Sequence, residues 1–247
     1  MAVTPVLQAD SIHKVFGPRT VLTAATLRAV PGQLTYLVGR NGCGKSTLLR
    51  IAAGELQAEG GVVFYKGRAM LRPRWHRLAR TGFAYLPDRE LLAPRRTLRE
   101  HLDVVVRQFG LPEPSDAVRR CGVERLLDVP CASLSTGERR RAELATILAR
   151  RPDCLLADEP HRHIDPEDRA VISEALRDLA RTGCAVVVTG HELEDLIRAA
   201  DAVTWCTDGT TYELGSAKEA LGHWRLVREY MGARRATELL EELEAIR

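Results

Sequence analysis

The chain has 247 residues, 45% of them hydrophobic, and a formal net charge of +3 at pH 7. This length allows one large or two small domains with a substantial core, and so small a charge does not by itself imply a polyanionic partner. No apolar run approaches the roughly 18 residues of a membrane-spanning helix, and the first residues lack a secretory apolar stretch, so any membrane role must go through a partner. The six cysteines form no Cys-x-x-Cys pair and several lie in strand-like apolar runs, which predicts free thiols in a reducing, cytoplasmic compartment.

The chain begins with a predicted pair of strands. Val6 to Val15 and Val21 to Val30 alternate or run apolar on either side of the turn signal Gly17-Pro18. Phe16 stands just before that turn. A buried strand is predicted next at Leu34 to Val38, and it leads directly into a glycine-rich loop.

That loop carries the motif around which the rest of the sequence is interpreted. It lies between the third strand and a helix that ends at Gly54, and it reads Gly39-Arg40-Asn41-Gly42-Cys43-Gly44-Lys45-Ser46-Thr47. The glycines let backbone N–H groups point into a concavity at the helix N-terminus, Lys45 reaches outer phosphates, and Ser46 offers a hydroxyl to Mg²⁺. A chance glycine-rich turn is the alternative, but the strand, Lys45 and Ser46 together favour a phosphate-binding loop.

Cys43 occupies a variable position of this loop. Backbone N–H groups, a helix N-terminus and Lys45 all stabilise a thiolate, so the pKa of Cys43 is predicted to fall below its ordinary value and bound nucleotide is predicted to cover the thiol. The alternative is that Cys43 is only a small residue that the loop tolerates.

Two more strands are predicted at Gly60 to Tyr65 and Phe83 to Leu86. The stretch from Arg68 to Arg99 holds nine arginines against only Asp88 and Glu90, which predicts either a solvated face or a docking surface for a partner or anionic lipid.

The strand pattern then gives way to helical spacing at Leu98 to Phe109 and at Ser115 to Leu127. These two segments predict a helical insertion into an α/β body. The insertion ends with Leu134-Ser135-Thr136-Gly137-Glu138, which opens a predicted helix from Glu138 to Ala149. Ser135 and Glu138 have capping-box spacing. The segment is either that cap alone or a second anion site, in which Ser135, Gly137 and the helix dipole face a phosphate held by another subunit.

Short apolar strands return at Cys154 to Ala157 and Ala185 to Val188, alternating with predicted helices in a parallel-sheet pattern; those helices are Glu167 to Arg181 and Glu192 to Ala200. Asp158 and Glu159 follow the first of these strands, where an α/β sheet places its ligand chemistry. Asp158 is predicted to hold Mg²⁺ and Glu159 to orient or deprotonate the water that attacks the γ-phosphate. Two solvated acids are the alternative.

His191 follows the second strand on the same sheet edge, where an imidazole can bond the γ-phosphate; ordinary surface is its alternative. A hairpin is predicted at Ala202 to Cys206 and Thr210 to Leu214, and a helix from Trp224 to Arg247. The helix carries one apolar stripe: Ala236, Leu239, Leu240, Leu243 and Ile246.

In order and content these motifs resemble the ATP-binding subunits of ABC transporters, over nearly the whole chain. The family's Walker A, signature, Walker B with catalytic glutamate, and switch histidine match residues 39–47, 134–138, 158–159 and 191. By the same resemblance, Phe16 corresponds to the aromatic residue that stacks on adenine, although a core role is equally open for it. His163-Ile164-Asp165 corresponds to the loop that crosses to the opposite subunit. Leu134 to Glu143 and Arg225 to Gly232 look most like the lipopolysaccharide-export and branched-chain amino acid import branch.

The resemblance implies an α/β P-loop NTPase (RecA-like) core with an N-terminal antiparallel β subdomain and an inserted α-helical subdomain. The expected division of a single domain, 1–247, is a nucleotide-binding core at 1–87 and 151–222, a helical subdomain at 88–150 and a C-terminal helical extension at 223–247. It also implies a head-to-tail dimer around two MgATP, docked through the insertion on transmembrane permease subunits at the inner face of the cell membrane.

Three departures from the family pattern bear on these expectations. Asp88 stands where the family has the Q-loop glutamine, which adds a charged contact for Mg²⁺. Thr136 replaces the first glycine of the usual signature, and His161-Arg162-His163 is unusually cationic.

The leading interpretation is an ATP-hydrolysing transporter motor that needs no nucleic acid. One alternative is a soluble ATPase acting on nucleic acid or the ribosome, favoured by the arginine-rich stretch and by a likeness of residues 158–165 to translation factors of the superfamily. Those factors usually carry two cassettes in one chain. A non-hydrolysing regulatory subunit is a third possibility, against which Glu159 speaks.

Overall fold

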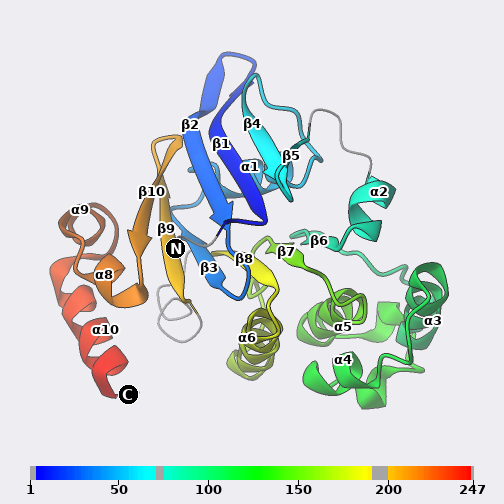
Figure 1. The fold of residues 1–247 in the computed structure, drawn as a ribbon. Helices are drawn as coiled ribbons and strands as arrows, with labels where there is room; N and C mark the ends of the chain where they lie inside the picture. Colours follow the sequence, from blue (N-terminus) through cyan, green and yellow to red (C-terminus); the bar gives the residue numbers. More distant parts are fainter. Residues whose placement is uncertain (1–3, 71–74, 191–199, 246–247) are drawn as a thin grey trace.

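The structure is a computed structural model, and it describes residues 4–70, 75–190 and 200–245. Its centre is a curled ten-stranded sheet in the order β5-β4-β1-β2-β10-β9-β3-β8-β7-β6 (Figure 1). The strands are β1 Leu7–Phe16, β2 Arg19–Ala29, β3 Leu34–Val38, β4 Gly60–Tyr65, β5 Arg68–Ala69, β6 Phe83–Leu86, β7 Cys154–Ala157, β8 Ala185–Gly190, β9 Ala202–Thr207 and β10 Thr210–Gly215.

The sheet joins an antiparallel part to a parallel part. β1 pairs antiparallel with β2 and β4, whereas β6, β7, β8, β3 and β9 run parallel to one another. β3, β7 and β8 are buried along their whole length, as expected for largely apolar strands at the centre of a parallel sheet. Their side chains alternate between two cores, because successive residues of a strand point to opposite faces.

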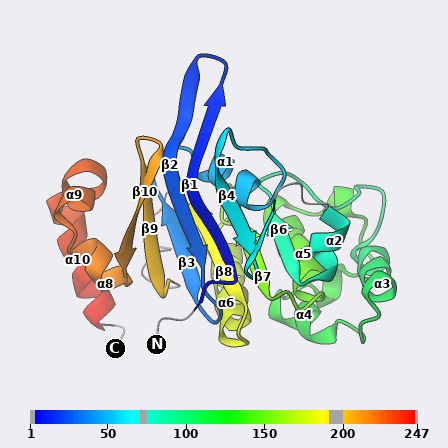
Figure 2. The same cartoon turned by 45° about the horizontal axis from the view of Figure 1, so that its top comes forward.

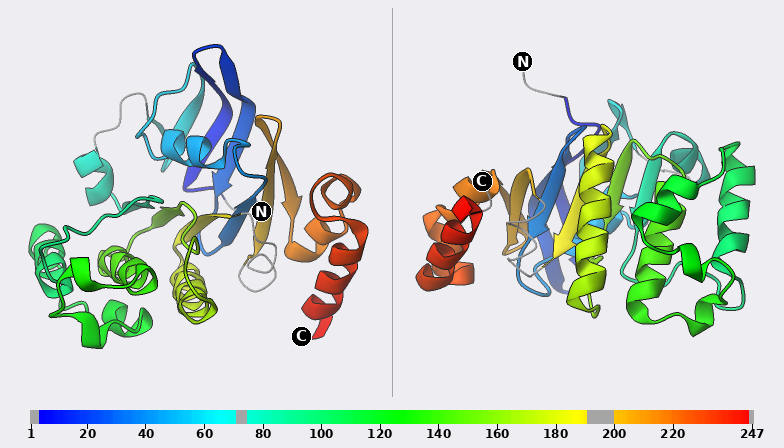
Figure 3. Two further views of the ribbon diagram at one scale, coloured as in Figure 1. Left: turned by 180° about the vertical axis from the view of Figure 1, so that it is seen from behind. Right: turned by 90° about the horizontal axis from the view of Figure 1, so that it is seen from below.

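Helices cover both faces and both ends of this sheet. They are α1 Lys45–Ala52, α2 Trp75–Arg80, α3 Leu98–Phe109, α4 Ser115–Arg120, α5 Thr136–Leu148, α6 Pro166–Arg181, α8 Ala217–Leu221, α9 Trp224–Leu226 and α10 Ala233–Ala245. α6 packs along one face of the parallel strands, and α1 lies on the other side, against the antiparallel strands (Figure 3). In the described residues, no helix is long and apolar enough to cross a membrane.

The helical insertion, α3 to α5, lies at the β6 edge of the sheet (Figure 2). Its first helix has the predicted bounds, because Thr97 and Glu100 form a reciprocal capping box at its start and Gly110 ends it with a φ of 64°. The C-terminal helices α8 to α10 lie at the opposite side of the molecule, beyond β10 (Figure 2). The nucleotide-binding strands therefore stand between two helical groups.

Two predicted helices were wrong in length. The helix expected over residues 115–127 ends at Arg120, since Gly122 has a φ of 59°, and a 3₁₀ turn follows at Glu124–Leu126. The helix expected over 224–247 is broken by Gly232, whose φ of 82° no helix accepts. Its apolar stripe is confirmed in α10 as far as Leu243: Ala236 and Leu239 are buried, and Leu240 and Leu243 pack beside them. Ile246 lies outside the described residues.

Two short helices, α2 and α8, were missed, and one predicted helix lies outside the described residues. α2 has only six residues between Trp75 and Arg80, too few to show a helical period. The helix predicted over residues 192–200 falls on 191–199, which the structure does not describe.

Candidate active site

The phosphate-binding loop connects the end of β3 to the start of α1, as the sequence predicts. Gly42 and Gly44 have φ values of 80° and 113°, which L side chains rarely adopt. A Cβ on Gly39 would come within 2.3 Å of the Cys206 carbonyl oxygen, and one on Gly44 within 2.6 Å of Leu22 Cδ2. The loop's path past β9 and β2 thus requires glycine at these positions.

Lys45 folds its side chain back over the loop. Its ammonium donates to the carbonyl oxygens of Gly39 at 2.7 Å and Arg40 at 3.2 Å, and the residue is 4% exposed. Because carbonyls are neutral, these bonds orient the ammonium without cancelling its charge. A buried cation so placed attracts phosphate oxygens.

Asp158 is tied to the loop from the neighbouring strand β7. Its Oδ1 accepts hydrogen bonds from Ser46 Oγ at 3.0 Å and from Thr189 Oγ1 at 2.7 Å. Its Oδ2 is buried and, among the described residues, has no hydrogen-bond partner. Burial is the main cause that raises the pKa of Asp158, the two hydroxyls oppose the shift, and the charges of Asp88 and Glu159 add to it.

These atoms fit Mg²⁺. An orphaned carboxylate oxygen beside a serine hydroxyl supplies the oxygen ligands that Mg²⁺ prefers, and a cation there would offset the cost of the buried charge. The described residues contain no group of three or more His, Cys, Asp or Glu side chains that could hold a metal. The ion would therefore depend on phosphate and water for its other ligands, as Mg²⁺ does in nucleotide sites.

Glu159 faces the same loop. Its φ of 42° places it in the left-handed region, and its backbone N–H donates to Thr189 Oγ1 at 2.8 Å. Its side chain helps to line a hollow that we call the phosphate hollow, together with Arg19, Val21, Gly42, Gly44, Lys45, Ser46 and Thr47. A second hollow next to it is lined by Asn41, Gly42, Glu159, His161, Arg162 and Thr189. The two carboxylates thus have different settings, Asp158 fixed and buried and Glu159 at the open edge.

Asp88 follows β6, next to the end of β7. The Arg162 guanidinium lies 3.8 Å from an Asp88 oxygen and 3.8 Å from a Glu159 oxygen. The cation of the unusual His161-Arg162-His163 segment therefore lies beside the unusual acid of the Q-loop position. The role of Asp88 toward the metal stays a prediction.

The signature residues open α5 in the helical insertion. Ser135 Oγ accepts from the Glu138 N–H at 3.1 Å, and the Glu138 carboxylate accepts from the Ser135 N–H at 2.8 Å, so the capping box is present. Gly137 is buried against α6, where a Cβ would come within 1.6 Å of an Asp168 carboxylate oxygen. None of these residues lines the two hollows at the phosphate loop.

Other predicted site residues lie around the loop. Phe16, at the end of β1, is 45% exposed, and the Lys14 ammonium lies 5.0 Å from its ring centroid. Arg40 donates to the Glu229 carbonyl oxygen at 2.6 Å, which joins the loop to the C-terminal segment. His191 lies outside the described residues.

The lowered pKa predicted for Cys43 is confirmed, at about 7. The largest cause was not foreseen: it is a hydrogen bond from the Cys206 thiol, and the nearby charge of Lys45 lowers the pKa further.

Sequence reasoning missed a buried ion pair on α5. Arg140 and Glu143 are 8% and 2% exposed and lie 3.0 Å apart. Arg140 donates to the carbonyl oxygens of Pro87 at 2.7 Å and Asp158 at 2.9 Å, while Glu143 accepts from the Leu91 N–H at 2.8 Å. The signature helix is thereby bonded to the ends of β6 and β7. The one available signal was a pair of opposite charges three residues apart.

Comparison with known proteins gives one family. A family model described as ABC transporter matches residues 22–162. The chain is 32% identical over 226 residues to Nod factor export ATP-binding protein I of Ralstonia nicotianae, covering 89% of this chain and 70% of that protein. It is 29% identical over 235 residues to a lipopolysaccharide export system ATP-binding protein of Acidithiobacillus ferridurans, covering 92% and 96%. The chain spans only 62% of a second Nod factor export protein, from Rhizobium etli.

Solved structures give the same fold. A nucleotide-free ATP-binding cassette from an ABC transporter matches with a TM-score of 0.80 at 20% identity, covering 93% of this chain and 100% of that one. An ATP-binding cassette in its ADP conformation matches with the same score, identity and coverage.

Proposed function

The chain belongs to the ABC transporter family and is one of its ATPases, and we propose that two copies close on two MgATP molecules to drive a membrane-embedded permease. Relatives named as export ATP-binding proteins support the transport role over action on nucleic acid or the ribosome. We place the protein in the cytoplasm, at the inner face of the cell membrane, because its permease partners would hold it there.

The observation that carries the proposal is that the adjacent carboxylates have different surroundings, with Asp158 buried and hydrogen-bonded and Glu159 at the edge of the phosphate hollow. Asp158, fixed by Ser46 and Thr189, would hold Mg²⁺ together with Ser46, and the ion would supply positive charge that offsets the charge of the phosphates. Lys45 and the N–H groups of the loop would bind the same phosphates. Glu159, across the phosphate hollow, would orient the attacking water and take its proton.

The remaining predicted residues complete the site from elsewhere. Phe16 would stack on adenine, and His191 would bond the γ-phosphate. Ser135 is exposed at the start of α5 and Gly137 is buried next to it, and we assign this N-terminus of α5 to the nucleotide held by the second copy. The helix N-terminus would face the γ-phosphate of that nucleotide.

Glu159→Gln tests this proposal. The variant should bind MgATP as tightly as wild type, turn over about 10²–10⁴-fold more slowly, and elute as an ATP-dependent dimer in size-exclusion chromatography, because both phosphate sites persist without the water-orienting carboxylate. Glu167→Gln, which removes an exposed carboxylate of α6, should behave as wild type. Wild-type turnover by Glu159→Gln would remove Glu159 from the mechanism.

A further inference from the structure

Two cysteines from distant parts of the chain meet beside the phosphate loop. Cys43 lies within the loop and Cys206 lies in β9, the strand next to β3. The Cys206 thiol donates to the Cys43 carbonyl oxygen at 3.4 Å. A Cβ built on Gly39 would lie 2.8 Å from Cys43 Sγ and 2.3 Å from the Cys206 carbonyl oxygen, so both residues close around the same glycine.

The two thiols differ in access and in acidity. Cys43 is only partly buried and Cys206 is fully buried, and both residues lie at one hollow that Arg19, Arg40 and Tyr230 also line. Hydrogen bonding between the two thiol side chains lowers the pKa of Cys43 to about 7 and, with burial, raises that of Cys206. An accessible cysteine of lowered pKa beside a second cysteine is the arrangement of an attacking and a resolving cysteine.

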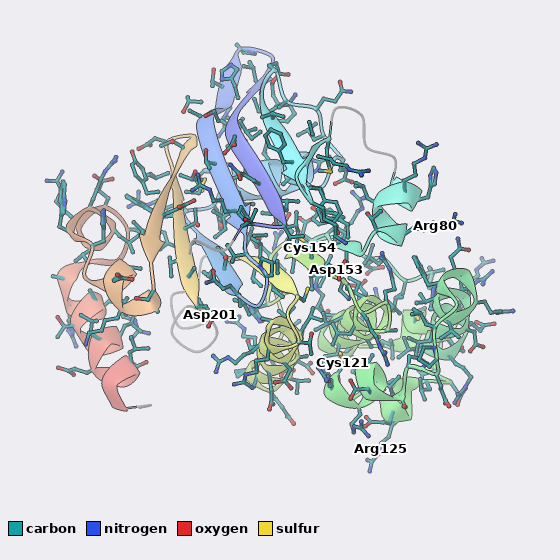
Figure 4. All side chains as sticks on the ribbon, in the orientation of Figure 1. Arg80, Cys121, Arg125, Asp153, Cys154 and Asp201 are labelled. Atoms are coloured by element: carbon teal, nitrogen blue, oxygen red, sulfur yellow. The ribbon has the colours of Figure 1, made fainter. Side chains whose placement is uncertain are left out.

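The other four cysteines lack this arrangement. Cys121, in the helical insertion, and Cys154, in β7, are buried (Figure 4). Cys131 and Cys184 are buried as well, and burial raises the pKa of all four thiols.

We propose that Cys43 and Cys206 form a modification site for hydroperoxides, whose product is a disulfide that closes the phosphate loop to nucleotide. The Cys43 thiolate attacks one peroxide oxygen, the S–O bond forms, the O–O bond breaks, and the departing oxide takes a proton to leave as water or an alcohol. Cys206 sulfur then attacks Cys43 sulfur, the S–S bond forms, and the S–O bond breaks. The hydroxide leaves as water with the Cys206 proton. Two electrons pass from the two thiols to the peroxide.

The disulfide should weaken nucleotide binding because the loop is closely packed at this point and cannot shift without changing its conformation. Gly39 already lies against the Cys206 backbone, and the Cys43 N–H donates to the Arg40 carbonyl oxygen at 3.2 Å. A covalent bond to β9 moves Cys43 and with it the neighbouring N–H groups of the loop. The inference rests on the proposed function in one respect, that this loop is the nucleotide site.

The experiment treats the full chain, free of reductant, with an equimolar amount of hydrogen peroxide. Peptide mass mapping without reduction should find a Cys43–Cys206 disulfide. Equilibrium binding of a fluorescent ATP analogue should weaken at least tenfold and recover with dithiothreitol, and prior MgATP should slow the oxidation. Cys206→Ala should bind nucleotide normally when reduced, form no disulfide, and instead yield a dimedone adduct on Cys43. Cys206→Ser serves the same purpose if the alanine variant folds poorly.

The proposal is overturned if oxidation stops at Cys43 in the wild-type chain, if peroxide joins other cysteines, or if the Cys43–Cys206 disulfide leaves nucleotide binding unchanged. Disulfide mapping and binding require no hydrolysis. A failure of Glu159→Gln to lose turnover would therefore leave this result standing, and the two proposals can fail separately.

Discussion

Asp88 and Arg162 form a charge pair at the edge of the active site. The family pattern predicts neither residue at its position. Arg162 lies between the carboxylates of Asp88 and Glu159. The charge of Asp88 also raises the pKa of Asp158, because the two carboxylates repel one another. A divalent cation at Asp158 would therefore be attracted by Asp88 and repelled by Arg162.

Asp88→Gln should raise the Mg²⁺ concentration that gives half-maximal ATPase activity about three- to tenfold, because one attracting carboxylate is lost and its pair is partly exposed. The variant should also show a smaller difference in ATPase activity between Mg²⁺ and Mn²⁺, since an amide is a weaker ligand than a carboxylate. Arg162→Gln is the matched control and should lower that concentration. If Asp88→Gln changes neither rate nor metal preference, the acid has no part in metal binding.

The loop, Asp158 and Glu159 could be predicted from the sequence because each motif is contiguous and directly follows a single strand. Thr189 could not be predicted. It bonds both Asp158 and the Glu159 backbone, but only the register of β7 against β8 brings them together. The Cys206 neighbour of Cys43 was missed for the same reason, since 163 residues separate the two.

The bond between α5 and the ends of β6 and β7 depends on the Arg140–Glu143 pair. Removing one partner should leave a buried, unpaired charge. We expect Arg140→Met or Glu143→Leu alone to lower the free energy of unfolding by about 3–5 kcal/mol, and the double variant to lose much less than the sum, because apolar side chains can replace a buried pair.

Urea denaturation of the four proteins measures this. The control is the Arg119–Asp116 pair in α4, which is exposed and has the same spacing. A double-mutant cycle for this pair should give a coupling energy below about 1 kcal/mol. Additive losses at Arg140 and Glu143 would mean that the two side chains act independently.

Helix boundaries could be predicted where local chemistry sets them. α3 begins at the Thr97 capping box and ends at Gly110, both visible in the sequence. The C-terminal helix was predicted as one piece from Trp224, although its apolar stripe begins only at Ala236, after Gly232. Only the packing of Leu239 against Leu221 shows that α10 turns back on α8. The period identified the buried face but not the break.

In the whole molecule, the helical insertion and the C-terminal helices lie on opposite sides of the sheet (Figure 1). The insertion side carries the exposed arginines of the basic stretch, including Arg80 on α2 (Figure 4) and Arg95 and Arg96 before α3. It also exposes two apolar side chains, Leu91 and Val104, which are 42% and 46% exposed. Mixed apolar and basic surface of this kind fits a protein partner better than a purely solvated face.

Arg95→Glu with Arg96→Glu should abolish co-purification with a multi-span membrane protein from detergent-solubilised source membranes, identified by mass spectrometry, while ATP binding by the soluble protein persists. Arg99 is left intact because it already pairs with Asp128 at 2.6 Å, so it does not offer the free charge that the sequence suggests. Arg107→Glu with Arg125→Glu makes the same charge change elsewhere on the insertion and should retain the partner. Tight, salt-sensitive RNA binding that is lost with Arg95 and Arg96 would instead assign this surface to nucleic acid, because phosphate contacts weaken steeply with salt.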